Sequence, residues 1–224
     1  MFTTRSSLGG REVVVFDLDD TLYNERDFLL SAYGEIARWI ESVSEARGVL
    51  EFMAATYADG VDVFEATLER FGLGIEKEEM VARYRTHKPA ISLSRDARET
   101  LERLGQRAVL GVITDGRSVT QRNKVDALQL QRYIPEGNII ISEEFGYAKP
   151  APEPYLYFEQ RYPEAGSYTY VGNSLLKDFV APNALGWRTM CLRDNGRNIR
   201  PQLFDQAPPT HLPQLCINKL SELI

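Results

Sequence analysis

Cysteine and histidine are both scarce, with two of each among 224 residues. The cysteines, Cys191 and Cys216, form neither a disulfide framework nor the spacing of a metal site, so we expect two inert thiols in a reducing compartment. Without clustered cysteine or histidine, the sequence lacks the ligands that zinc prefers. Any metal ion is therefore expected to be bound by oxygen ligands.

Long apolar runs are absent as well. A membrane helix needs about 18 or more apolar residues, and no segment approaches this length. The only apolar run near the N-terminus, Val13–Phe16, ends at once at Asp17 and does not resemble a signal peptide. These absences predict a cytoplasmic protein with no membrane partner.

Positive charge is in deficit, because 26 Lys and Arg stand against 32 Asp and Glu, a net charge of −6. Proteins dedicated to nucleic acids usually carry clustered Lys and Arg, so we expect no nucleic-acid partner. A small phosphorylated molecule stays compatible with this balance, since a few local cations or a metal ion can outweigh the average field. The 43% hydrophobic and 26% charged residues are typical of a globular protein and exclude disorder. None of these values determines the oligomeric state.

Hydrophobic periodicity predicts an α/β fold. Residues Glu12–Leu18 form a continuous, β-branched run, which is typical of a strand buried on both faces of a parallel sheet. After Arg95 helical and strand patterns alternate, which indicates βαβ units and an open parallel sheet. Further strands are expected at Ala108–Thr114, Asn138–Ser142, Tyr168–Val171 and Thr189–Leu192, and helices at Asp96–Leu104, Val119–Leu128, Glu153–Tyr162 and Leu175–Leu185.

A helical block interrupts this sheet after its first strand. Apolar residues recur at helical spacing from Phe28 to Ile40, and three more helices are expected at Val49–Tyr57, Val61–Phe71 and Lys77–Thr86. No strand pattern occurs in this stretch. We therefore predict two units: an α/β core of residues 11–23 and 93–224, and an all-helical insertion of residues 24–92.

Polar residues follow four of the expected strands, at the ends where open parallel sheets bind ligands. Each group alone has an ordinary explanation as a turn, a helix cap or a surface residue, and for Asn173 the alternative is the N-cap of the helix expected at Leu175–Leu185. Four unrelated turns would have to fall on one sheet edge for all of these explanations to hold. The groups are Asp17-Leu18-Asp19-Asp20-Thr21, Thr114-Asp115-Gly116, Lys149-Pro150, and Gly172-Asn173-Ser174 with Asp178.

The acidic members of these groups predict a site for Mg²⁺. Asp17 and Asp19 lie two residues apart at a strand end, so strand alternation directs both carboxylates to the same side. Two adjacent carboxylates repel unless a cation lies beside them, and Mg²⁺ takes oxygen ligands. Asp178 and Asn173 can supply further oxygens from the fourth strand end.

The remaining members predict a site for a dianionic phosphoryl group. Lys149 offers a compact positive charge suited to a phosphoryl oxygen. The hydroxyl of Thr114 and the backbone N–H groups around Asp115 and Gly116 offer neutral donors, and the glycine allows a ligand to approach the main chain.

Taken in order, these motifs resemble those of the haloacid dehalogenase-like (HAD) hydrolase superfamily. The resemblance spans residues 13–192 and implies a Rossmann-like parallel sheet core flanked by helices. The helical insertion of residues 24–92 lies where that superfamily places a small helical cap. Two flanking segments, Gln121-Arg122-Asn123-Lys124 and Glu144–Pro150, are similar to the phosphatase-like branch with such a cap.

The resemblance implies a role for each site residue. Asp17 is the nucleophile that becomes an aspartyl phosphate, and Asp19 protonates the leaving oxygen and later deprotonates water. Thr114 and Lys149 hold the phosphoryl oxygens. The resemblance implies that Mg²⁺ is bound by Asp17, the main-chain carbonyl of Asp19, and Asp178. Asn173 departs from the pattern, since many relatives have Asp there, and Asn removes one negative charge.

The sequence thus predicts a Mg²⁺-dependent phosphomonoester hydrolase that acts on a small phosphorylated metabolite. One alternative is a 2-haloacid dehalogenase-type hydrolase, which Asp19 disfavours because a halide leaving group needs no proton. Another is a non-catalytic, phospho-ligand-binding or regulatory protein of the same fold, which Asn173 alone favours. Candidates for substrate selection, chosen by position or chemistry, are Tyr23, Asn24, Tyr33, His87 and Lys88.

Overall fold

The computed structural model describes residues 10–58 and 60–224, and its centre is a six-stranded, fully parallel sheet. The strand order is β3-β2-β1-β4-β5-β6, so the first strand of the chain lies inside the sheet. This architecture confirms the predicted Rossmann-like fold. The strands are β1 (Glu12–Phe16), β2 (Ala108–Thr114), β3 (Ile139–Ile141), β4 (Ser167–Gly172), β5 (Arg188–Leu192) and β6 (Leu215–Ile217).

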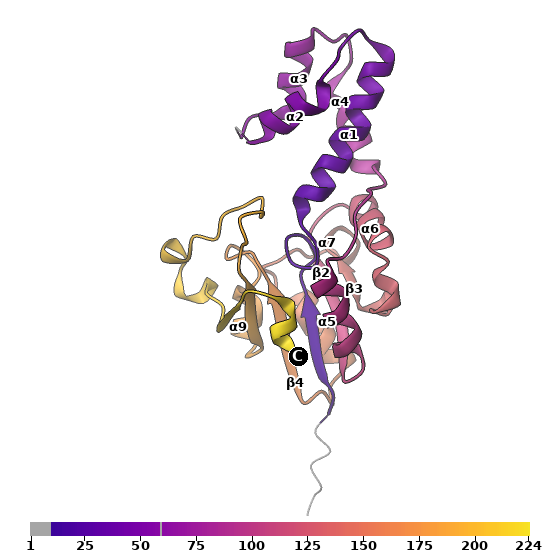
Figure 1. Ribbon diagram of the computed structural model, residues 1–224. Coiled ribbons are helices and arrows are strands. Elements are labelled where there is room, and N and C mark those ends of the chain that lie inside the picture. Colours follow the sequence, from indigo (N-terminus) through magenta and orange to yellow (C-terminus); the bar gives the residue numbers. More distant parts are fainter. Residues whose placement is uncertain (1–9, 59) are drawn as a thin grey trace, which may run out of the picture.

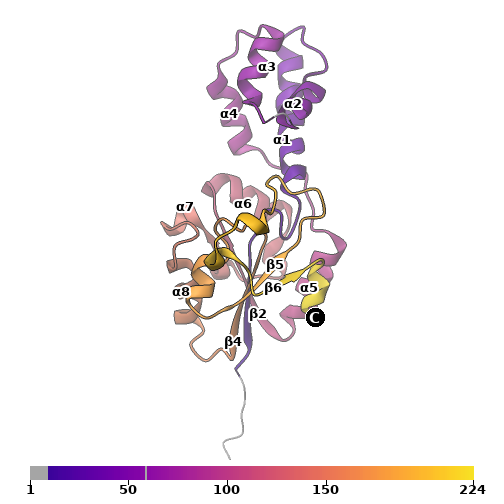
Figure 2. The ribbon, with the colours of Figure 1, turned by 90° about the vertical axis from the view of Figure 1, so that its left-hand side faces the viewer.

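Helices cover both faces of the sheet, which explains why β1 is apolar at every position after Glu12. Val14 and Phe16 contribute to the apolar cluster beneath α5 (Arg95–Gly105) and α6 (Ser118–Ala127). Val13 and Val15 contribute to the cluster on the opposite face, beneath α8 (Glu153–Arg161) and α9 (Val180–Ala184). The helices flank the sheet in the view of Figure 2.

Four helices between β1 and α5 form a separate group beyond the end of β1 (Figure 1). They share an apolar cluster of their own, which includes Ile36, Ile40, Met53 and Met80. Tyr84 packs against both this cluster and the sheet cluster under α5 and α6. The helices are α1 (Glu25–Val43), α2 (Val49–Ala58), α3 (Val63–Phe71) and α4 (Lys77–Thr86).

Residues 193–214, here called the strap, connect β5 to β6 and reach the start of α1. The strap contains the short 3-10 helices η3 (Phe204–Gln206) and η4 (Pro209–His211). Arg197 forms an ion pair of 2.7 Å with Asp27 of α1, and Ile199 packs against the cluster of the four helices. The strap therefore contacts the helical group at a place separate from the two segments through which the chain enters and leaves that group.

The predicted helix at Leu175–Leu185 is wrong over its first half. Residues 175–179 form turns and α9 begins only at Val180. The physical reason is Asp178, whose carboxylate accepts the backbone N–H groups of Asn173 and Ser174 and so holds a compact loop. The strand β6 was not expected, since it has only three residues. Also unexpected were α7 (Ser142–Phe145) and the 3-10 helices η1 (Leu130–Arg132), η2 (Glu136–Asn138) and η5 (Leu220–Leu223).

No helix within the described residues is long and apolar enough to cross a bilayer.

Candidate functional site

The strand order reverses between β1 and β4, and the crevice at such a switch point is the usual ligand site of an open α/β sheet. Asp17 follows β1 and donates its backbone N–H to the carbonyl of Val171 in β4, at 2.8 Å. Thr114 ends the neighbouring strand β2. The structure therefore brings the predicted strand-end residues to one edge.

Lys149 is the centre of this edge. Its Nζ lies 2.6 Å from Oδ1 of Asp17 and 2.7 Å from Oδ1 of Asp178, and it donates to the hydroxyl of Tyr170 at 3.1 Å. The side chains of Lys149 and Asp178 are fully buried, with 0% exposed. One ammonium group thus joins two carboxylates that come from different strand ends.

The charge of this cluster does not balance. Burial raises the pKa of Asp17 to about 7 against the opposing charge of Lys149, and Asp178 adds to the rise. Burial opposes the charge of Lys149 too, but the two carboxylates raise its pKa well above the usual value. With all three groups ionised, the cluster carries a net charge of −1, so an additional cation beside Asp17 would stabilise its carboxylate.

Asp178 also orders the loop after β4. Its Oδ2 accepts the N–H groups of Asn173 at 3.0 Å and Ser174 at 2.8 Å. A Cβ atom on residue 172 would lie 2.5 Å from this oxygen, so only glycine fits at Gly172. Both oxygens of Asp178 are therefore engaged, one by Lys149 and one by the loop.

The oxygens near Asp17 fit Mg²⁺ better than a metal that needs many charged ligands. Among residues 10–58 and 60–224, no group of three or more His, Cys, Asp or Glu is arranged to hold a metal ion. Asn173 offers a neutral oxygen, Oδ1, which accepts only a long bond of 3.4 Å from Thr21. Mg²⁺ is commonly bound by one or two carboxylates together with water and substrate phosphate oxygens. Asp17, Asp178 and Asn173 supply oxygen donors of that kind.

Among the described residues, Asp19 and Asp17 have different lysine partners. The strand ends at Phe16, and Asp20 adopts a left-handed conformation with φ of 56° that turns the chain. Lys124 lies 2.7 Å from Oδ1 of Asp19. Burial opposes ionisation of Asp19, but Lys124 and the hydrogen bonds that Asp19 accepts outweigh it and hold its pKa below the usual value.

The Thr114-Asp115-Gly116 segment is held in place by hydrogen bonds. Gln121 donates to Oγ1 of Thr114 at 2.6 Å, which leaves the threonine proton available for donation to a ligand. Asp115 accepts the backbone N–H of Lys149 at 3.0 Å. The N–H of Gly116 donates to Ser142 Oγ at 3.0 Å, so this predicted donor already has a partner.

Three charged or polar residues of the site were not predicted from the sequence. Lys124 and Gln121 contact Asp19, and Lys177 pairs with Asp115 at 2.7 Å. Gln121 and Lys124 are three residues apart on α6, so they face the same side of the helix. Two polar residues with this spacing, on the helix that follows Thr114, were the sequence feature that could have identified Gln121 and Lys124 as site residues.

Of the candidates for substrate selection, Tyr23 contacts the site directly, because its hydroxyl donates to Oδ1 of Asp19. His87 is instead buried at the base of the four helices, hydrogen-bonded to Ser31 at 2.7 Å and to Glu35. Tyr33 packs among aromatic rings, 6.3 Å from Tyr57 between centroids.

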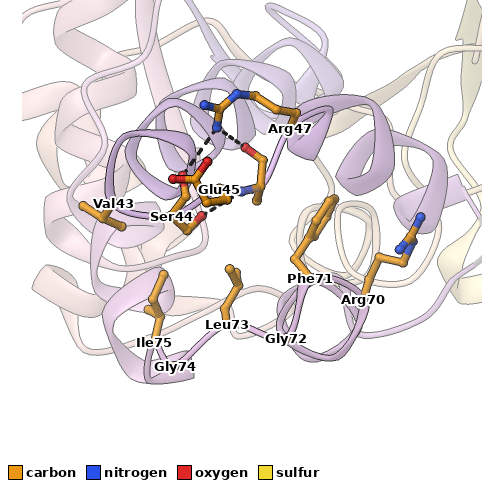
Figure 3. A pocket seen from close by; sticks show the side chains of 11 residues that line it. Val43, Ser44, Glu45, Arg47, Arg70, Phe71, Gly72, Leu73, Gly74 and Ile75 are labelled. Atoms are coloured by element: carbon orange, nitrogen blue, oxygen red, sulfur yellow. Dashed lines mark hydrogen bonds between the residues drawn. The ribbon is translucent and has the colours of Figure 1, made fainter.

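A hollow of about 650 Å³ lies at the far end of the four helices, between residues 43–47 and 70–75 (Figure 3). Arg47 on its wall donates to carbonyls of Glu41, Ser44 and Ala46 and so satisfies the end of α1. None of the strand-end residues lines this hollow, so it is separate from the site around Lys149.

A parallel α/β sheet with a buried lysine between two aspartates at its switch point has the arrangement of a ligand site in an open α/β sheet. The chain belongs to the haloacid dehalogenase-like hydrolase family, whose model matches residues 14–192. This finding confirms the resemblance seen in the sequence.

Curated relatives bear the names of phosphatases. The chain is 28% identical to the glyceraldehyde 3-phosphate phosphatase of Methanocaldococcus jannaschii over 227 residues, which cover 94% of each protein. It is 30% identical to the ribulose-1,5-bisphosphate 5-phosphatase of Halopiger xanaduensis over 138 residues, 59% of this chain and 56% of that protein. These names agree with the predicted HAD-like phosphatase.

Solved structures share the fold. The HAD hydrolase YfnB from Bacillus subtilis, in a magnesium-bound form, aligns with a TM-score of 0.67 and 20% identity over 96% of this chain and 97% of that one. A HAD phosphatase from Thermococcus onnurineus aligns with a TM-score of 0.56 and 23% identity over 95% of each chain.

Proposed function

We propose that the protein is a Mg²⁺-dependent phosphomonoester hydrolase that acts through an aspartyl phosphate on Asp17. The observation that carries this proposal is the buried contact of Lys149 with Asp17 and Asp178. A lysine beside the attacking carboxylate orients that carboxylate. The same lysine can reach an oxygen bound to the phosphorus that Asp17 attacks. The Oδ2 atom of Asp17 accepts no hydrogen bond from any described residue, so it is the attacking oxygen.

The reaction has two steps. In the first, an oxygen of Asp17 forms a bond to phosphorus while the bond from phosphorus to the substrate oxygen breaks. Asp19 gives a proton to that oxygen, after the negative charge of the bound phosphoryl group has raised the low pKa of Asp19. In the second, Asp19 takes a proton from a water molecule, which attacks phosphorus and releases inorganic phosphate from Asp17. Each step returns Asp19 to the form that the other step needs.

Lys149 and Thr114 bind the transferring phosphoryl group. Lys149 supplies charge, and Thr114 donates the hydroxyl proton that its bond from Gln121 leaves available. Asp17, the main-chain carbonyl of Asp19, Asp178 and Asn173 would hold Mg²⁺, whose positive charge would reduce repulsion between the nucleophile and the phosphate.

The substrate class follows from the relatives' names: we propose a small sugar phosphate or triose phosphate. We further propose that residues 24–92 act as a cap that closes over the site and sets the substrate preference, while residues 11–23 and 93–224 carry the chemistry. Closing lids serve to exclude water in many enzymes. A cytoplasmic location is part of the proposal.

Phosphate release tests this function. Purified protein is assayed with glyceraldehyde 3-phosphate, ribulose 1,5-bisphosphate and an aryl phosphate, with Mg²⁺ and after chelation. We expect release only with Mg²⁺, and none from Asp17→Asn, which keeps the shape of the side chain but removes its nucleophilic charge. In a single turnover in labelled water, the label is expected in the released phosphate, because water attacks phosphorus, and an acid quench is expected to trap a phosphoryl group on Asp17.

Two outcomes contradict the proposal. Undiminished turnover after thorough chelation would exclude the role of Mg²⁺, and the absence of a phosphoryl group on Asp17 after an acid quench would indicate direct attack by water on the substrate. Chloride release from 2-chloropropionate would support the dehalogenase alternative. Binding of phosphorylated ligands without turnover would support the regulatory one.

A further inference from the structure

Three side chains hold the carboxylate of Asp19. Lys124 lies 2.7 Å from its Oδ1, Tyr23 donates its hydroxyl to the same oxygen, and Gln121 donates to Oδ2 at 3.0 Å. Lys124 and Gln121 both come from α6, which is separated from Asp19 by more than 100 residues of sequence. The orientation of this carboxylate is therefore set both by Tyr23 of its own turn and by two side chains of α6.

Lys124 is a buried cation with a single carboxylate partner among the described residues. Its side chain is 4% exposed, and its one salt bridge is to Asp19. A buried charge that loses its partner is costly, because water cannot replace the lost contact. Lys124 and Asp19 consequently restrain each other's position more strongly than an exposed pair would.

Lys124 also contacts the helical group. Its Nζ lies 4.5 Å from the centroid of the Phe28 ring, within the range of a cation–π interaction. Phe28 is in the first turn of α1, and its ring packs edge-on against Tyr84 of α4 at 5.4 Å. Lys124 thus bridges the strand-end site and the base of α1 and α4.

We propose that Lys124 is a positioning residue for Asp19, and that its contact with Phe28 couples the placement of Asp19 to helix α1. The proposal rests on the proposed function, because it concerns the residue that exchanges protons with substrate and water. Lys124 acts through Asp19 and does not bind the phosphoryl group, a role proposed for Lys149. A movement of α1 that carries Phe28 away from Lys124 changes the restraint on Asp19.

The central test is Lys124→Met, which keeps much of the apolar stem and removes the ammonium group. We expect kcat/KM for an alkyl phosphate such as glycerol 3-phosphate to fall by roughly 10- to 100-fold, since a misplacement of about 1 Å can cost about 100-fold. The loss for p-nitrophenyl phosphate is expected to be much smaller, because its leaving group needs little help from a proton. Lys124→Arg is expected to recover part of the alkyl phosphate activity.

Lys77→Met is the matched control, because it breaks a lysine–carboxylate pair of the same 2.7 Å length, to Asp62, on the surface of the helical group. It is expected to leave both activities unchanged. Phe28→Leu keeps an apolar side chain but removes the ring. It is expected to lower kcat/KM by less than Lys124→Met does, and again to affect the alkyl phosphate more than p-nitrophenyl phosphate.

A double-mutant cycle separates positioning from a general effect on folding. If Lys124 acts through Asp19, then Lys124→Met causes no further loss of kcat/KM in an Asp19→Asn background. An equal loss for both substrates that adds to that of Asp19→Asn would overturn the proposal. So would wild-type behaviour of Lys124→Met.

A thermal version of the cycle needs no substrate. Lys124→Met is expected to lower the melting temperature of the wild-type chain by more than that of the Asp19→Asn variant. Equal decreases in the two backgrounds would show that Lys124 does not stabilise Asp19 and would overturn the proposal. If the wild-type chain releases no phosphate at all, the proposed function fails, whereas the melting temperatures still decide whether Lys124 holds Asp19.

Discussion

At the scale of single residues, the site depends on buried charges that have few partners. Lys149 faces two carboxylates and is completely buried, and Asp178 is buried with it. A buried ion pair adds little to stability compared with apolar packing, but removing one member leaves an uncompensated charge. Substitutions in this cluster should therefore affect both activity and folding.

We predict that Lys149→Met destabilises the protein by about 3–5 kcal/mol, because Asp17 and Asp178 lose the cation they share. Urea denaturation measures the loss, and phosphatase activity is expected to disappear as well. Lys177→Met serves as the control, since Lys177 is 36% exposed and its pair with Asp115 is worth at most about 1 kcal/mol. Similar losses for the two variants would contradict this account of the cluster.

The role of Asn173 as a metal ligand can be tested as well. The structure removes the helix N-cap alternative, because α9 begins at Val180 and its N-cap position is Phe179. We predict that Asn173→Asp lowers the Mg²⁺ concentration needed for half-maximal activity, because a carboxylate attracts a divalent cation more strongly than an amide oxygen does.

The same variant can be followed without turnover. The added negative charge in the loop that Asp178 holds is expected to lower the melting temperature without Mg²⁺ and to increase the rise that Mg²⁺ produces. Asn218→Asp adds the same charge at an exposed position beyond β6 and is expected to change neither value. An unchanged Mg²⁺ titration for Asn173→Asp would exclude this residue from the metal site.

At the scale of elements, the turn between β1 and α1 joins three parts of the chain. Asp20 is buried in this turn, where its Oδ1 accepts the N–H of Glu25 and its Oδ2 accepts the N–H of Ile199, each at 2.9 Å. The turn therefore fixes the start of α1 and the strap with one carboxylate, next to Asp17 and Asp19.

We predict that Asp20→Ala costs about 2–4 kcal/mol of stability. Two N–H groups lose their acceptor, and alanine tolerates the left-handed conformation at φ of 56° poorly. Asp20→Asn is expected to cost less than about half of this, since Asn keeps one oxygen acceptor and visits the same conformation more readily. Chemical denaturation of both variants checks the order, and equal costs would contradict it.

At the scale of the whole molecule, the apolar residues fall into separate clusters. Two clusters lie on opposite faces of the sheet, and a third lies among α1–α4. Tyr84 packs against both the third cluster and a sheet cluster, and Ile199 of the strap packs against the third cluster. This arrangement allows the helical group to open without breaking the sheet.

We predict that amide hydrogen exchange divides the molecule along the same line. Strands β1, β2 and β4 are expected to exchange most slowly, because β1 is hydrogen-bonded on both sides and buried. Helices α2, α3 and α4 are expected to open earlier and together as low denaturant is added. A single opening free energy for every element would contradict a separable cap of residues 24–92.

Much of the fold could be predicted because the signals are local. The buried run of β1 and the alternation after Arg95 reflect burial on both sheet faces, which the order of apolar residues records directly. The short elements escaped prediction, since three residues such as Leu215–Ile217 carry too little pattern. The helix expected from Leu175 failed because a single side chain, Asp178, takes up the N–H groups of the loop before it.

The sequence by itself determined the family, the parallel sheet, and the strand ends at which polar residues gather. Only the tertiary structure decided which of those residues pair: Lys149 with Asp17 across 132 positions, and Lys124 with Asp19 across 105. The physical reason is that strand and helix patterns report which face of an element is buried, whereas an ion pair depends on the directions of two side chains brought together by packing. Asp17 and Asp19 are near neighbours in sequence, yet their carboxylates pair with different lysines.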